Sequence, residues 1–174
     1  MTQVPPKSVN RSVLAGLAAA WVKARSERPL QAAAELVLPP SPAQKREVGA
    51  DPSGHPENMP PAVVIGRVAA KLGYPGLPVA QRLRVQRLVH YGFGSGLGLA
   101  YAVFARQRKA GGTVDGALVG LAVYLATHGS LLPALRIQRP PWRLAPAAVT
   151  WEAGSHVIWG AALARIGLML GAWR

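Results

Sequence analysis

The sequence contains no cysteine, which excludes both a disulfide framework and a thiolate metal site. Charge is scarce as well, because only 16% of the 174 residues are charged, whereas about 25% is typical of soluble domains. The 7 acidic residues are outnumbered by 20 Lys and Arg, so the formal net charge is +13. The chain is therefore apolar and strongly basic, and its length fits one domain.

Aromatic residues are also few, at 6% of the chain, and they are not interleaved with the basic residues. A nucleic-acid-binding protein of this charge would use aromatic side chains as stacking platforms. Here the Lys and Arg fall mostly between apolar blocks, which is where a membrane protein meets anionic lipid headgroups. We therefore predict a lipid bilayer with anionic headgroups as the partner of this charge, and no nucleic acid.

The apolar residues make up half of the chain and are gathered into blocks. Three blocks reach the length of about 20 residues that a membrane-spanning helix needs, and a shorter block lies near the N-terminus. We expect spans at about residues 12–30, 85–105, 114–135 and 149–171. The prediction is one all-α domain, an integral membrane four-helix bundle with an additional amphipathic surface helix.

The first block has two interpretations. Basic residues precede it as in a secretory signal, but Lys23-Ala24-Arg25 stands where a small-residue cleavage site would be. The preferred interpretation continues the helix through Lys23 and Glu27, which lie four residues apart and can pair. Pairing and snorkelling would let this helix span the membrane, and Pro29 would kink or end it.

Residues 39–80 are expected to form a loop and the surface helix. Residues 41–61 are polar and rich in Pro and Gly, which is typical of a loop. Residues 61–72 are apolar, with Arg67 and Lys71 on one side. This pattern predicts an amphipathic helix lying on the membrane surface.

Glycines recur at intervals of four in the later spans. The pairs are Gly92 with Gly96, Gly94 with Gly98, and Gly116 with Gly120. A phosphate-binding loop would need a strand before these glycines, and none is evident. On a helix, small residues four apart let a neighbouring helix approach closely. We predict that these glycines mark helix-packing faces, which would also suit a homo-oligomer or a larger membrane complex.

Six of the ionisable residues within the expected spans are candidate site residues. They are His90, His128, His156, Glu152, Lys23 and Glu27. In four antiparallel spans, the three histidines would lie roughly 8 to 12 Å below the same membrane face, given the helical rise per residue. Glu152 and His156 are four residues apart and share one helix face. Because such groups are costly in a membrane without partners, we expect them to meet.

Three roles fit this cluster. The histidines fix helix register through hydrogen bonds, or they form a protonatable group with Glu152, or they hold a metal or haem with Glu152. Proton handling is the leading mechanism, with His128, His156 and Glu152 at its centre and His90 and the Lys23–Glu27 pair tuning it. No catalytic residue, enzyme activity or resident cofactor is predicted. A different class of function, a non-enzymatic accessory subunit that packs on a larger membrane complex, also stays open.

Four short pieces occur in an order that covers most of the chain. They are Val22-Lys23-x-x-x-Glu27 before a proline-rich loop, His90-x-x-Phe93 with Tyr101, Gly116 and Gly120 with His128-x-x-x-x-Pro133, and Glu152-x-x-x-His156-x-x-Trp159. Together they resemble the YagU-like family of small bacterial inner-membrane proteins. The resemblance implies a multi-pass inner-membrane protein without established enzyme activity and with a link to acid resistance. This chain departs from the family in an extra stretch at residues 28–36 and a more basic loop after the third span.

Overall fold

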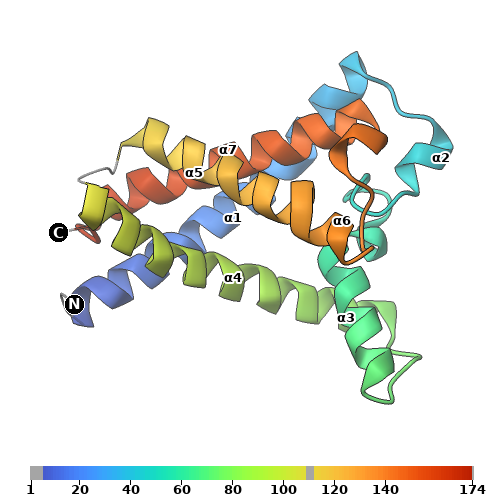
Figure 1. Ribbon diagram of the computed structural model, residues 1–174, viewed down its shortest axis with the longest axis horizontal. Helices are drawn as coiled ribbons and strands as arrows, with labels where there is room; N and C mark the ends of the chain where they lie inside the picture. The colour runs from blue at the N-terminus through green and yellow to red at the C-terminus, as the bar shows by residue number, and fades with distance from the viewer. Residues whose placement is uncertain (1–5, 109–111, 174) are drawn as a thin grey trace. The chain divides into compact units, whose positions relative to one another are not determined.

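The computed structural model describes residues 6–108 and 112–173, and within these ranges every regular element is helical (Figure 1). The all-α prediction is therefore confirmed. In chain order the elements are α1 (Pro6–Val37), α2 (Pro42–Lys45), η1 (Pro56–Asn58), α3 (Pro60–Lys71), α4 (Val79–Arg108), α5 (Thr113–Ala126), η2 (Thr127–Leu131), α6 (Leu132–Ala134), η3 (Pro141–Arg143) and α7 (Pro146–Met169). The four segments in which we expected spans lie on α1, on α4, on the run from α5 to α6, and on α7.

Helix α1 continues through Pro29, so of the two predicted effects, a kink or a helix end, the helix end is wrong. A proline inside a helix removes one backbone donor and crowds the preceding turn. The turns after it are nevertheless anchored, because Gln31 and Ala34 are buried and the amide of Gln31 donates to Asp51 at 2.7 Å. These tertiary contacts offset the local loss, and the helix ends just before Pro39 and Pro40.

Two short elements start the segment at residues 39–80. Ser41 caps α2, since its hydroxyl accepts from the backbone N–H of Gln44 and the Gln44 side chain accepts from the Ser41 N–H at 2.8 Å. Such a reciprocal cap satisfies two N–H groups that the first turn leaves without partners. Helix α3 begins at Pro60, a position where the missing N–H costs nothing, and occupies the segment predicted to be amphipathic.

Two helical stretches are long and apolar enough to cross a membrane, Val79–Arg106 and Thr113–Ala134. Helices α1 and α7, which we also expected to span, do not pass the same test over their described residues. The reason lies in their composition: α1 carries a charged run between Lys23 and Arg28, and α7 carries Glu152, His156 and Arg165. The four-span bundle therefore stays a prediction.

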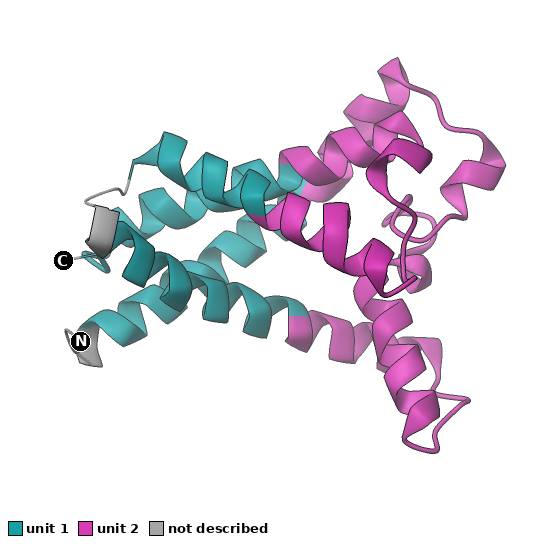
Figure 2. Cartoon of the chain, in the orientation of Figure 1, with its two compact units in different colours: residues 1–26, 90–122, 155–174 teal, residues 27–89, 123–154 magenta. Residues whose placement is uncertain are grey.

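The chain divides into two compact units (Figure 2). Unit 1 comprises residues 1–26, 90–122 and 155–174, and unit 2 comprises residues 27–89 and 123–154. The large helices run through both units, so each unit contains a portion of each.

Unit 1 is built on two close helix crossings. At Gly98 an added methyl carbon would overlap the carbonyl oxygen of Ser12 and lie 3.0 Å from Cα of Gly16, so α1 and α4 meet backbone to backbone. At Gly116 and Gly120 it would overlap the carbonyl oxygens of Gly160 and His156, so α5 and α7 meet in the same way. The surrounding core consists largely of alanine. Small residues that admit close backbone approach are typical of helix packing in membranes.

The glycine pairs on α4 do not share one role. Gly94 and Gly98 are buried against α1, with the methyl position of Gly94 2.8 Å from Cβ of Ala20. Gly92 and Gly96 are exposed, and a methyl carbon at either would meet nothing within 4 Å. Within this chain, Gly94 and Gly98 therefore pack against another helix, whereas packing of Gly92 and Gly96 against a helix stays a prediction. Two residues along a helix correspond to about 200° of rotation, so the second pair lies on the opposite face.

Unit 2 is organised around Trp151, whose side chain is 1% exposed. It packs with Ala34, Met59 and Ala147, and Leu30 covers the same cluster. Its indole N–H donates to the carbonyl oxygen of Ala50 at 3.3 Å. Trp151 therefore joins α7 to α1 and to the loop that precedes α3.

Candidate functional site

His128 lies in a π-helical turn, Thr127–Leu131, between α5 and α6. Pro133 follows two residues after this turn, and its ring would crowd the carbonyl four residues before it in a regular helix. A wider turn relieves this crowding, and the hydroxyls of Thr127 and Ser130 donate to carbonyl oxygens of the preceding turn at 2.7 Å and 2.6 Å. Single π-helical turns are frequent at functional sites. Here the turn carries an ionisable side chain.

The imidazole of His128 meets two buried polar side chains. Its Nδ1 lies 2.9 Å from Oε1 of Gln138 and 3.2 Å from Oε2 of Glu152. The exposed fractions are 9% for His128, 5% for Gln138 and 4% for Glu152. Tyr124, one turn earlier on α5, stacks on the imidazole with ring centroids 5.5 Å apart and ring planes 12° from parallel. We call His128, Glu152 and Gln138 the His–Glu cluster.

The partners of Nδ1 decide where its hydrogen lies. Both neighbouring atoms are oxygens, so a hydrogen on Nδ1 is donated to Oε1 of Gln138, with Oε2 of Glu152 3.2 Å away. A carboxylate that accepts from an imidazole orients the ring and can exchange a proton with it. The cluster therefore has the parts of a protonation site: one imidazole, one carboxylate, and an amide that holds the ring from the loop after α6.

The other predicted site residues have separate surroundings. Nε2 of His90 lies 3.1 Å from the carbonyl oxygen of Ala20 within unit 1. His156 also belongs to unit 1 and is 8% exposed, and its carbonyl oxygen lies against Gly120. Lys23 and Glu27 are half-buried one turn apart on α1. The structure brings His128 and Glu152 together, and the meeting of all three imidazoles stays a prediction.

A second polar network ties the loop after α2 to α1. The carboxylate of Asp51 accepts from the backbone N–H groups of Ser53 and Gly54 and from the side chain of Gln31. Burial alone would raise the pKa of Asp51, but these hydrogen bonds and the nearby charge of Lys45 outweigh it and lower the pKa below 3.8. The network is internally satisfied, and its carboxylate is ionised at neutral pH.

Lys45 extends this network. Its ammonium group donates to Glu35. That hydrogen bond is the main reason that the pKa of Lys45 rises above 10.5, although burial acts in the opposite direction. We regard this network as structural support for the loop.

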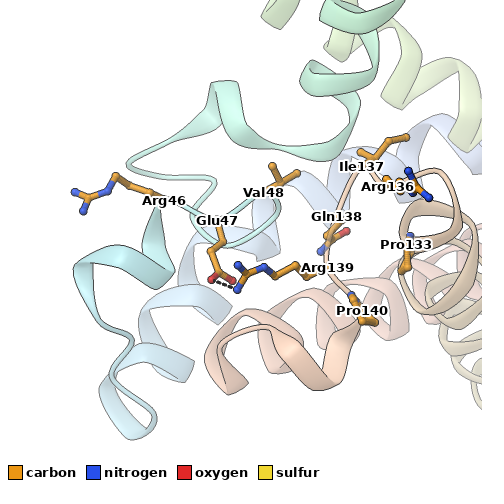
Figure 3. Close-up of a pocket in the computed structure, with 9 residues that line it drawn as sticks. All are labelled: Arg46, Glu47, Val48, Pro133, Arg136, Ile137, Gln138, Arg139 and Pro140. Carbon is orange, nitrogen blue, oxygen red and sulfur yellow. Dashed lines mark hydrogen bonds and ion pairs between the residues drawn. The ribbon is translucent and has the colours of Figure 1, made fainter.

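An open pocket of about 510 Å³ lies between two loops of unit 2 (Figure 3). Its lining residues are Arg46, Glu47, Val48, Pro133, Arg136, Ile137, Gln138, Arg139 and Pro140. Arg139 extends across the pocket and donates to Oε1 of Glu47 at 2.8 Å (Figure 3). Because Gln138 belongs both to this lining and to the His–Glu cluster, one side chain connects the pocket with His128.

A protein-family model described as "Protein of unknown function (DUF1440)" matches residues 30–164 of the chain. The chain belongs to this family. No curated protein and no solved structure matches it. The matched range contains the whole His–Glu cluster and the pocket lining, so both lie in the portion that the family shares.

Metal ligation receives no geometric support over residues 6–108 and 112–173. No group of three or more His, Cys, Asp or Glu side chains is placed there to hold a metal ion.

Sequence reasoning missed Gln138. This amide lies in a loop of prolines and arginines, outside the spans in which partners for the histidines were sought. The only available signal was that it is an uncharged polar residue within a basic loop. That signal does not reveal a buried hydrogen bond to a residue ten positions earlier.

Proposed function

We propose that this chain is a multi-pass bacterial inner-membrane protein, without enzyme activity, that responds to pH or handles protons through the His–Glu cluster. The observation that carries the proposal is the contact of 3.2 Å between Nδ1 of His128 and Oε2 of Glu152, both buried and both on helices expected to span. A link to acid tolerance, which the YagU-like resemblance implies, would follow from such a site.

The membrane placement is supported by apolar surface that the protein leaves uncovered. In an apolar 18-residue window of each candidate span, only 28% and 17% of the residues are buried within the chain. Large side chains on them are exposed, such as Leu88 at 75% and Val114 at 72%. The core helix of a soluble protein would instead be mostly buried, and contiguous exposed apolar surface marks contact with a membrane or a partner. A bilayer with anionic headgroups is the partner that also suits the charge of +13.

Ser130, which lies two residues after His128, is not placed to act as a nucleophile. The Oγ of Ser130 donates to the carbonyl oxygen of Ala126 at 2.6 Å, within its own helix. Activation of a serine requires a base within hydrogen-bond reach of that hydroxyl. The arrangement therefore favours proton binding over covalent chemistry.

Removing either ionisable member of the His–Glu cluster is expected to abolish proton transport or the response to pH. Proton flux can be measured in liposomes that contain the full-length protein, an entrapped pH indicator and an imposed pH gradient. His128→Gln and Glu152→Gln should each lower this flux at least about tenfold, as expected when a proton-transfer group is lost. If the protein senses pH instead, both variants should lose the change in tryptophan fluorescence between pH 5 and pH 8, where imidazole titrates.

His55→Gln is the matched control, because it removes an imidazole outside the predicted cluster, where His55 lies 3.4 Å from Glu57. It should retain both signals. The proposal is contradicted if folded His128→Gln and Glu152→Gln proteins both behave as wild type in the two assays. The cluster would then have only a structural role.

A second candidate is an accessory or self-associating membrane subunit. It is favoured by the face of α4 that carries Gly92 and Gly96, where nothing in the described chain lies within 4 Å of either methyl position. Two small residues four apart on an open apolar face are suited to a second helix. In mild detergent, Gly92→Ile with Gly96→Ile should dissociate a dimer or release a co-purifying subunit, whereas Leu118→Ile on α5 should not. An unchanged particle mass in the double variant would contradict this role.

A further inference from the structure

The pocket between residues 46–48 and 133–140 carries an excess of positive charge. Three arginines line it against one glutamate, Glu47, which leaves two positive charges in excess. The pair of Arg139 with Glu47 fixes one guanidinium group within the pocket. Among the described residues, no hydrogen bond or ion pair engages the guanidinium groups of Arg46 and Arg136. Both groups are exposed, and Figure 3 shows them extending to opposite sides of the pocket, so each would turn inward to reach an external anion.

Arg136 occupies a backbone conformation that disfavours it. Its φ is +53°, and it is the one non-glycine residue with a positive φ over the described ranges. The N–H of Ile137 bonds to the carbonyl of Leu132, and that of Arg136 to Pro133, which is a helix end that normally uses glycine. The guanidinium of Arg67 donates to the carbonyl of Arg136 at 2.8 Å and holds this turn. An arginine kept where glycine fits better points to a role for its side chain.

The pocket wall also contains a buried amide side chain. Gln138 is 5% exposed, and its Oε1 is occupied by His128. Its Nε2 has no hydrogen-bond partner among the described residues. A buried amide with one end that lacks a partner is uncommon in proteins. The arginines of the lining supply the charged donors that oxyanions need.

We propose that this pocket binds a phosphate-type anion, either the phosphate of a lipid headgroup or a free phosphate ester. Guanidinium forks match phosphate oxygens in pairs. The volume of about 510 Å³ falls within the roughly 300–1,000 Å³ range of small-molecule sites, so an esterified group fits. The lining loops lie at or beyond the ends of the expected spans, where headgroups occur. The lipid source rests on the membrane placement proposed above, whereas the free anion does not.

The test compares two double variants of the full-length protein that lose the same charge. Arg46→Gln with Arg136→Gly empties the pocket of its available guanidinium groups, and glycine suits the positive φ, so the turn is kept. Arg84→Gln with Arg143→Gln is the control, because both arginines are exposed in unit 2 and neither lines the pocket. One arm measures binding of inorganic phosphate in neutral detergent by calorimetry. The other arm starts from nanodiscs that contain both phosphatidylglycerol and phosphatidylcholine. Native mass spectrometry then measures how much of each lipid stays bound to the protein.

The pocket variant should weaken the affinity at least about tenfold, since charge-assisted hydrogen bonds are lost, and the control should stay within about twofold of wild type. Loss in the phosphate arm identifies a free anion, and loss in the phosphatidylglycerol arm alone identifies a headgroup. The proposal is overturned if wild-type protein binds neither, or if the control double variant weakens binding as much as the pocket variant. Neither result bears on proton handling, which does not use Arg46 or Arg136.

Discussion

Replacing Gly98 by alanine is expected to destabilise the protein by at least about 2 kcal/mol, because an overpacked helix crossing must open. The added methyl carbon would overlap the carbonyl oxygen of Ser12 and lie 3.0 Å from Cα of Gly16. Both neighbours are helix backbone, so no flexible side chain can move away. The loss would appear as a lower midpoint in thermal or denaturant unfolding of the protein in micelles.

Gly96→Ala is the matched control on the same helix. Its methyl carbon would meet nothing within 4 Å, and alanine favours a helix over glycine by about 1 kcal/mol. The two substitutions are therefore expected to shift stability in opposite directions although they are chemically identical. Equal shifts would contradict the α1–α4 crossing at Gly98.

Helix positions were predictable from the sequence because apolar blocks are long and well separated. Helix ends were less predictable: α4 begins at Val79 rather than near residue 85, and α1 runs from Pro6 to Val37 rather than across residues 12–30. An apolar block indicates only the part of a helix that suits lipid. The helix itself continues into polar residues, because their backbone groups form the same hydrogen bonds along the helix. The continuation of α1 past Pro29 was also not predictable from the local sequence, because buried residues after Pro29 stabilise the helix there.

The glycine pattern and the ionisable residues show the same limit. Spacing alone cannot separate Gly94 and Gly98 from Gly92 and Gly96, because both pairs repeat at four residues and only the position of α1 distinguishes them. Depth along the spans predicted that His128 and Glu152 would find partners, and they contact each other. It could not predict Gln138 or the carbonyl of Ala20, because a loop amide and a backbone oxygen carry no periodic signal.

Trp151→Ala is expected to be the most destabilising substitution in unit 2, at about 3–5 kcal/mol. The indole is 1% exposed and packs with Ala34, Met59 and Ala147. Its removal leaves a cavity, and it also leaves the carbonyl of Ala50 without its donor. The destabilisation is expected whether water or lipid surrounds the unit, because the atoms that line the cavity lose their packing partners in either case. Unfolding of the protein in micelles, followed by circular dichroism, measures the effect.

Trp142→Ala removes the same side chain from the same unit, but Trp142 is 78% exposed, so the free energy of unfolding should change by no more than about 0.5 kcal/mol.

Trp151 also precedes Glu152 on α7, and its burial fixes the rotation of α7 that directs Glu152 toward His128. The proton response should therefore weaken in Trp151→Ala and persist in Trp142→Ala. Trp151→Phe keeps most of the packing without the N–H and should fall between them in stability. If Trp142→Ala and Trp151→Ala destabilise equally, this indole is not the anchor of unit 2, and the alignment of Glu152 requires another cause.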